Sequence, residues 1–168
     1  MKQLSTYIQE KLIINKDYRD AKISTPKSFD ELRNIIKDRY KKLGSGTKQD
    51  PIDFNDIDVS HISSFYDKNN ANGIFDSMDF KYIDISDWNV SNVTDMSYMF
   101  FNCQLLKSVG DLSGWDVSNV TDMSFMFYES EKLESVGDIS KWNVSNVSNN
   151  DFMFHRCLIK EEYKPKFK

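Results

Sequence analysis

One phrase recurs along this chain and restricts its fold more than any other feature. "WNVSNVTDMSYMF" begins at Trp88, "WDVSNVTDMSFMF" at Trp115 and "WNVSNVSNNDFMF" at Trp142, so the copies start 27 residues apart. A fixed period in the twenties is typical of solenoid proteins, in which each repeat buries its apolar face only against its neighbours. The sequence therefore predicts a stack of repeats in which equivalent residues lie one above another.

An imperfect first copy precedes these three. "IDVSHISSFY", at residues 57–66, fits the same frame, with Ile57 in the place of the tryptophan. Ile57 and Trp88 are 31 residues apart, four more than the period, and we expect the extra residues around "DKNNANG" at 67–73. Below, the copies are called repeat 1 (residues 57–87), repeat 2 (88–114), repeat 3 (115–141) and repeat 4 (142–157).

Within the phrase, an apolar side chain stands at every third position. In repeat 2 these are Val90, Val93, Met96 and Met99. A tightly curving path, part strand and part turn, presents inward residues with this spacing. We expect short parallel strands near residues 106–112 and a short helix or 3₁₀ turn in "DMSYMFFNC" at 95–103. Internal backbone groups would be satisfied by an asparagine ladder, which is formed by Asn92, Asn119 and Asn146.

Residues 52–157 resemble the BspA-type leucine-rich-repeat family, specifically its "mycoplasma lipoprotein" repeat, a domain of unknown function. The family hallmark is W-[DN]-V-S-N-V-T-x-M-x-x-M-F. Repeats 2 and 3 match it throughout, and repeat 4 departs at Ser148, Asn149 and Asn150. The resemblance implies an α/β fold, namely a leucine-rich-repeat-like right-handed solenoid of about four coils. It also implies a family of surface or adhesion proteins that bind other proteins.

Helices are predicted on the N-terminal side of the repeats, at residues 3–14 and 28–43. In the second, Ser28 and Glu31 form a capping box and Gly44 is placed to end the helix. The predicted organisation is a helical segment at 1–44, a linker at 45–51, the solenoid at 52–157 and a basic tail at 158–168. Residues 1–44 serve either as an α-helical cap on the stack or as a docking segment.

Charge is distributed unevenly along the chain. Residues 1–44 carry a balance of +5, residues 45–154 carry −12 and residues 155–168 carry +3, for a net charge of −4. An acidic repeat region argues against a nucleic-acid groove. It favours a protein partner with basic patches, or contact with the basic ends of the same molecule.

The expected compartment is the cytoplasm. The N-terminus lacks the apolar core of a signal peptide and a lipid-attachment cysteine, and no run is long enough for a membrane span. Cys103 and Cys157 lie two periods apart, about 10 Å in a stack, which is too far for a disulfide. "LSTYIQEKLIINKDY", at residues 4–18, is similar to leader segments on small proteins of gut bacteria and their phages, which favours an intracellular or phage-associated role.

The sequence predicts no catalytic site, no metal site and no cofactor. His61 stands in the place of Asn92, and His155 follows the last "MF", so we expect a ladder role and a packing role. Two Cys and two His have no zinc spacing. "DKNNANG" fits a calcium loop at Asp67 and Asn69 but has Met78 in the place of the bidentate glutamate.

The candidate binding residues are polar positions that recur with the period. They are Asp84, Asp111 and Asp138, with Asn89, Asp116 and Asn143. The aspartates either accept hydrogen bonds from the serine two residues on, or hold a metal ion or a basic partner.

A second ambiguous column is aromatic and consists of Tyr98, Phe125 and Phe152. We expect these side chains to point inward. An outward column would form an apolar stripe, and such stripes mark protein interfaces.

Taken together, these features predict a non-enzymatic protein–protein interaction module on a short solenoid. The alternative is a structural or assembly component, for example a phage-associated one, docked through its N-terminal helices. A hydrolase or lyase on this scaffold would need a carboxylate-lined cleft, for which a short stack leaves little room. Self-association is left open.

Overall fold

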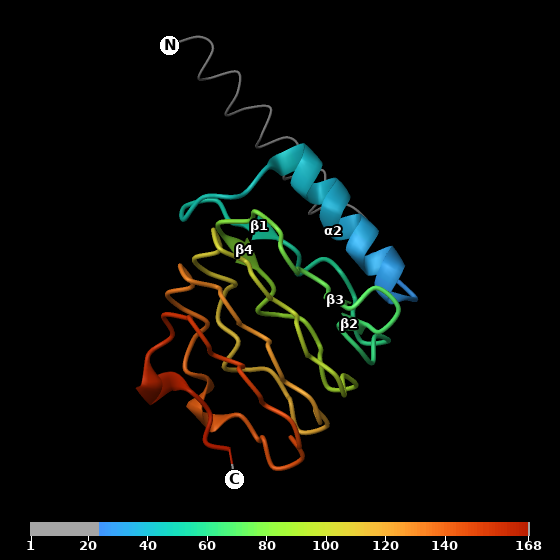
Figure 1. The fold of residues 1–168 in the computed structure, drawn as a ribbon. Coiled ribbons are helices and arrows are strands. Elements are labelled where there is room, and N and C mark those ends of the chain that lie inside the picture. Colours follow the sequence, from blue (N-terminus) through green and yellow to red (C-terminus); the bar gives the residue numbers. More distant parts are fainter. Residues whose placement is uncertain (1–23, 168) are drawn as a thin grey trace.

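The structure, a computed structural model, describes residues 24–167. Its elements are helix α2 (Phe29–Leu43), strands β1 (Ile52–Asp53), β2 (Tyr66–Asp67), β3 (Asn72–Gly73) and β4 (Ile83–Asp84), and the 3₁₀ helices η1 (Ile139–Lys141) and η2 (Glu161–Tyr163). Helix α2 lies across one end of a stack of irregular loops, and this stack continues to the C-terminus (Figure 1). The helix expected at residues 3–14 lies outside the described residues.

The capping signals read from the sequence form the ends of α2. The Ser28 hydroxyl accepts a hydrogen bond from the Glu31 N–H, and the Glu31 carboxylate accepts one from the Lys27 N–H. At the other end, Gly44 has a φ of 77° and donates its N–H to the Tyr40 carbonyl. Because glycine alone enters this conformation without strain, the helix ends there.

The apolar stripe of α2 packs on repeat 1. Leu32, Ile36 and Leu43 are buried in the same cluster as Phe54 and Phe80 of the chain below. In Figure 1 the helix covers the end of the stack at which β1 and β4 lie. The apolar face of α2 is thus covered within the chain itself.

Two arginines of α2 supply polar contacts to the same end. Arg39 is buried, donates to both carboxylate oxygens of Asp56 and also reaches the Asp53 carbonyl. Arg33 donates to the carbonyl of Gly73. Carbonyl groups at this end of the stack, those of Asp53 and Gly73, therefore receive charged donors from the helix.

Parallel backbone pairing joins each repeat to the next. Strand β1 pairs in parallel with β4, and the other repeats are linked by single parallel bridges. The bridges are Tyr82–Ser108, Ser108–Ser135, Ser64–Asp95, Asp95–Asp122 and Asp122–Asn149. The strand expected near 106–112 is reduced to the bridge at Ser108, because Gly110 turns the chain with a φ of 87°.

Of the short helix or 3₁₀ turn expected at 95–103, the structure shows non-consecutive i→i+3 turns and no helix. The segment consists of overlapping turns, in which alternate N–H groups donate to the carbonyl three residues back. The remaining N–H groups donate to repeat 3, and they belong to Met96, Tyr98, Phe100 and Asn102. A 3₁₀ helix needs consecutive i→i+3 hydrogen bonds, whereas here every second N–H donates to the neighbouring repeat.

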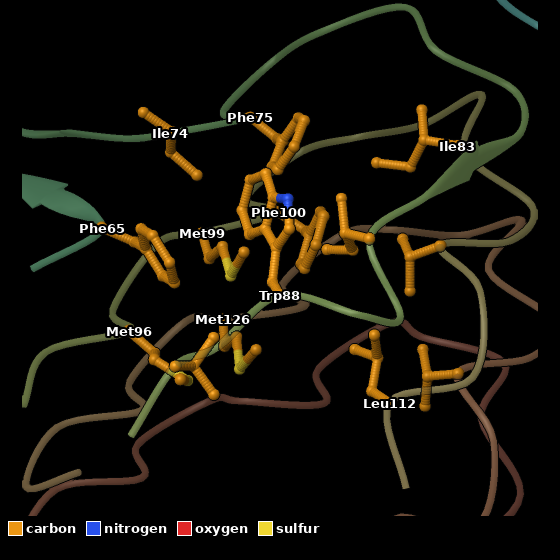
Figure 2. Close-up of a cluster of buried hydrophobic side chains, with 14 of the residues drawn as sticks. Phe65, Ile74, Phe75, Ile83, Trp88, Met96, Met99, Phe100, Leu112 and Met126 are labelled. Atoms are coloured by element: carbon orange, nitrogen blue, oxygen red, sulfur yellow. The ribbon is translucent and has the colours of Figure 1, made fainter. Parts of the chain in front are cut away.

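Equivalent side chains fill the interior of the stack. Phe75 lies parallel to Phe100, with ring centroids 5.2 Å apart, and Phe100 lies parallel to Phe127 at 5.4 Å. Figure 2 shows Phe75, Phe100 and Trp88 packed together, with methionines of successive repeats beside them. The tryptophans also satisfy their buried polar atoms, since Trp88 Nε1 donates to the Phe54 carbonyl and later copies repeat this bond one period on.

The extra residues of repeat 1 form a hairpin in which β2 pairs antiparallel with β3. Asp67 accepts hydrogen bonds from the Asn69 N–H and the Asn70 side chain within the turn. Among residues 24–167, no group of three or more His, Cys, Asp or Glu side chains is placed to hold a metal ion. Within the same residues, no helix is long and apolar enough to cross a membrane.

The C-terminal segment folds back on repeat 4. Ile159 and Pro165 are buried, Phe167 packs on the core, and Lys164 Nζ lies 5.2 Å from the centre of the Phe154 ring. The segment described as a basic tail is therefore an ordered cover over part of the last repeat.

We predict that Arg39→Ala lowers the free energy of unfolding by about 3–5 kcal/mol, because Asp56 then keeps a half-buried charge without its partner. Urea denaturation followed by circular dichroism measures this change. Lys37→Ala, an exposed position on the same helix, is the matched control and should change stability by less than about 0.5 kcal/mol. Equal effects of the two substitutions would contradict the assigned role of Arg39.

Candidate interaction surface

Two columns of aromatic side chains run along one side of the stack. The first consists of Tyr66, Tyr98, Phe125 and Phe152, and the second of Phe101, Tyr128 and His155. Together they are called the aromatic surface. Each residue comes from the turn segment of its repeat, or from the hairpin in the case of Tyr66.

Neighbouring rings within each column lie face to face. In the first column the centroids are 5.3, 4.8 and 5.3 Å apart, and in the second they are 5.1 and 5.1 Å apart. The columns also touch each other, since Phe125 lies 6.4 Å from Phe101 and 5.5 Å from Tyr128. The result is one continuous patch of ring edges rather than a set of isolated side chains.

The expectation that the first column points inward is wrong. Tyr98 and Phe125 are only half-buried, and Phe152 is 59% exposed. The physical reason lies in the residues that follow, because Met99 and Phe100 are fully buried and occupy the interior. Because these two adjacent side chains fill the interior, the side chain of Tyr98 points outward.

The backbone at the first column is held in an unusual conformation. Tyr98, Phe125 and Phe152 have φ values of 56°, 56° and 54°. For a bulky residue this left-handed region costs about 1–2 kcal/mol, and residues in it cluster at functional sites. Stacked aromatic pairs contribute about 0.5–1.5 kcal/mol each, so ring stacking is large enough to offset most of this strain.

The protonation of the tyrosine in the first column reflects its surroundings. Partial burial raises the pKa of Tyr98, with smaller contributions from Tyr66 and from the charge of Asp122. The hydroxyl therefore stays neutral at physiological pH, and the surface carries no charge of its own at this position. Asp122 is the acidic side chain that acts on it.

The predicted aspartate column lies in the turns before each tryptophan. Asp84 accepts hydrogen bonds from both the N–H and the hydroxyl of Ser86, and Asp138 accepts the same pair from Ser140. Asp111 accepts from the Ser113 N–H. These hydrogen bonds support the alternative in which each aspartate stabilises its own turn by accepting from the serine two residues on.

Glycine makes room for this column. A Cβ atom on Gly110 would lie 2.5 Å from Asp84 Oδ1, and one on Gly137 would lie even closer to Asp111 Oδ1. Asp84 and Asp111 are thus each packed against the glycine turn of the next repeat. Asp84 is half-buried, whereas Asp111 and Asp138 are exposed.

The remaining predicted contact residues hold a second series of turns and are exposed. The side chains of Asn89, Asp116 and Asn143 accept hydrogen bonds from the N–H groups of the serines two residues on. The structure brings neither polar series together into a pocket with a catalytic arrangement. Their role in binding stays a prediction.

The asparagine ladder is present, but it lies at the surface rather than inside. Asn92, Asn119 and Asn146 each donate a side-chain hydrogen bond to a serine carbonyl of the preceding repeat, at 2.8, 2.8 and 2.6 Å. All three residues are exposed. Their contribution is to lock register between repeats along a solvent-facing turn.

The two cysteines and His155 make packing contacts, whereas the ladder hydrogen bond expected of His61 is not among those of the described residues. Cys103 is buried, donates to the Phe75 carbonyl and has its pKa raised to about 12 by burial. Cys157 is free and half-buried, and burial raises its pKa. His155 stacks on Tyr128, whereas His61 is exposed and lies 3.9 Å from Asp58.

Sequence reasoning missed the second aromatic column. Phe101, Tyr128 and His155 follow directly after "MF" in three repeats, and this spacing could have revealed them. This position is aromatic or histidine in every complete copy, and it follows a residue already assigned to the core. Such a position predicts a second stacked column outside the core.

One family model matches most of the chain, including the residues that form this surface. Residues 53–162 match a family described as "Mycoplasma protein of unknown function, DUF285". The chain belongs to this family, and the matched range includes all of residues 57–157, the four repeats. No curated protein and no solved structure matches the chain.

Acid should weaken the turns held by the exposed aspartates. Hydrogen bonds from the serine hydroxyl and then the serine N–H lower the pKa of Asp116 and Asp138 below the ordinary 3.8. Their stabilising contribution is therefore present above that value and is lost as pH falls through the lower folded pKa. We predict a stability that declines between about pH 5 and about pH 2.

The matched variant is Asp116→Asn, because the chain itself places asparagine at the equivalent positions 89 and 143. Its stability at neutral pH should be close to that of the wild type, and its decline in acid should be shallower. Urea unfolding at a series of pH values measures both. An unchanged acid decline would contradict the assigned role of Asp116.

Proposed function

We propose that this chain is a non-enzymatic protein-binding module whose aromatic surface contacts the partner. The observation that carries the proposal is the pair of stacked aromatic columns, which are half-buried along most of their length and open to solvent at Phe152 and His155. Large apolar patches of this kind mark interaction sites on soluble domains. Tyrosine and other aromatic side chains are also enriched among the residues that dominate binding energy.

The chemistry of the surface suggests what the partner presents. Rings stacked face to face leave mainly their edges open, so apolar side chains fit the centre of the patch better than a single cation fits a ring face. Interfaces commonly surround an apolar centre with a polar rim. The acidic residues 45–154, with a balance of −12, favour lysine or arginine on the rim of the partner rather than nucleic acid.

The scaffold proposed for this module is a right-handed leucine-rich-repeat-like solenoid of the BspA-like type. Parallel bridges at each repeat and side chains stacked one period apart support it. The assembly alternative docks through the N-terminal helices predicted at 3–14 and 28–43. The apolar face of the second is not available, since Leu32 and Ile36 of α2 are fully buried, and the first lies outside the described residues. The interaction module is therefore favoured, with a cytoplasmic or phage-associated location as its expected setting.

The proposal is tested with Phe125→Asn, which removes the central ring of the first column. Asparagine tolerates the φ of 56° at this position better than other polar residues do. We therefore expect a folded protein that captures its partner from a lysate of the native host about tenfold less efficiently.

The control is the triple variant Asp84→Asn, Asp111→Asn, Asp138→Asn. Retained capture by the triple variant together with lost capture by Phe125→Asn places binding on the aromatic surface. The reverse result places it on the aspartate column and overturns the proposal. If neither variant captures less of the partner than the wild type does, both proposed binding sites are contradicted.

A further inference from the structure

The turn segments of the repeats are joined by a one-directional set of backbone hydrogen bonds. In repeat 3, Met123, Phe125, Phe127 and Glu129 donate their N–H groups to repeat 4. Repeat 2 donates to repeat 3 from the equivalent residues. Every second N–H in this segment therefore points toward the C-terminal end of the stack.

In repeat 4, the same donors have no acceptor among residues 24–167. They are the N–H groups of Asn150, Phe152, Phe154 and Arg156. Alternate residues donating to one side are the pattern of a strand edge, and such edges template the pairing of another chain. The last repeat thus presents four donors in the register that earlier repeats use for their neighbours.

The opposite end of the stack is closed by the helix. There Arg33 of α2 donates to the carbonyls of Gly73 and Asp76, and the Ser24 N–H donates to the carbonyl of Asp56. Within the described chain, no acceptor forms a hydrogen bond with the backbone N–H of Phe152 or of Phe154. The two ends therefore differ, with carbonyls satisfied at one and amides open at the other.

A cavity of about 320 Å³ adjoins the open amides. It lies between Phe152 and His155 on one side and Lys164 and Phe167 on the other. The C-terminal segment covers Phe154 but leaves Phe152 59% exposed, at the end of its aromatic column. The site therefore combines backbone donors with an unstacked ring face and room for a side chain.

We propose that this edge accepts an extended segment of a different protein, which adds to repeat 4 in parallel register. The segment supplies backbone carbonyls at alternate residues and an apolar or aromatic side chain that stacks on Phe152. This mode of recognition takes its affinity from main-chain hydrogen bonds and its specificity from side-chain pockets. It does not rest on the proposed function, because its donors are backbone groups at the end of the stack.

A second copy of this chain is a poorer occupant. Its own open edge offers only donors, which cannot pair with donors. Its carbonyl edge lies under α2, where Arg33 occupies the Gly73 carbonyl. A partner with free carbonyls is therefore the complement that the edge requires.

The first test is amide hydrogen exchange in the free full-length chain, followed by NMR. The N–H groups of residues 150, 152, 154 and 156 should exchange at least about tenfold faster than those of residues 123, 125, 127 and 129. Equal protection of the two sets would show that the edge is already covered and would overturn the proposal. Protection that rises with protein concentration would assign the edge to a second copy and would also overturn it.

The second test uses a peptide of residues 120–130, whose carbonyls at 122, 124, 126 and 128 accept the repeat 2 donors within the chain. The peptide should bind the full-length chain and slow exchange at the four open amides, whereas a scrambled peptide should not. Absence of binding, or protection elsewhere, would overturn the proposal.

Variants at the edge sharpen this result. Phe152→Lys removes the exposed ring and should weaken peptide binding at least about tenfold. Ser145→Lys adds the same charge at another exposed position of repeat 4 and should leave binding unchanged. Equal affinities of the two variants would contradict a site at Phe152, and the exchange map of the wild type remains decisive if Phe152→Lys unfolds.

Discussion

The alternate amide donated from each repeat to the next is the interaction on which the rest of this structure depends. Phe100 donates its N–H to the Met126 carbonyl at 2.8 Å, and Phe127 donates its own to Met153 at 2.9 Å. Because the donors recur every second residue, equivalent side chains are held one above another. Rings can then stack on rings, and each Trp indole N–H reaches a carbonyl 30 or 34 residues earlier in the chain. Register, packing and polar satisfaction follow from one repeated geometry.

The same geometry explains the exposed aromatic surface. Phe125 occupies the left-handed region with a φ of 56°, and its neighbours Met126 and Phe127 take the interior. A small polar residue would relieve the strain, yet the chain places a tyrosine or phenylalanine at this position in every complete repeat. Stacking offsets the strain within the column, and the open ring edges leave a surface suited to an apolar partner.

Much of this arrangement could be predicted from the sequence, because a strict period states which residues are equivalent. The 27-residue spacing identified the core valines and methionines, and the Ser28–Glu31 signature gave the start of α2. Inward or outward direction could not be predicted for Tyr98, since a three-residue spacing does not distinguish a turn with positive φ from a short helix. Nor could the spacing show that Asn92 lies at the surface, because its bond to the Ser60 carbonyl depends on where the turn faces.

The most direct test of the central claim is disulfide trapping between equivalent positions. Thr94, Thr121 and Ser148 form an exposed column joined by backbone bonds of 2.8 and 2.9 Å. Adjacent repeats place Cα atoms about 5 Å apart, within the limit of about 7 Å for a disulfide. Under mild oxidation, Thr121→Cys with Ser148→Cys should form a bond that peptide mass mapping detects, whereas Thr94→Cys with Ser148→Cys should stay reduced. A bond in the second pair, or its absence in the first, would contradict stacking in register.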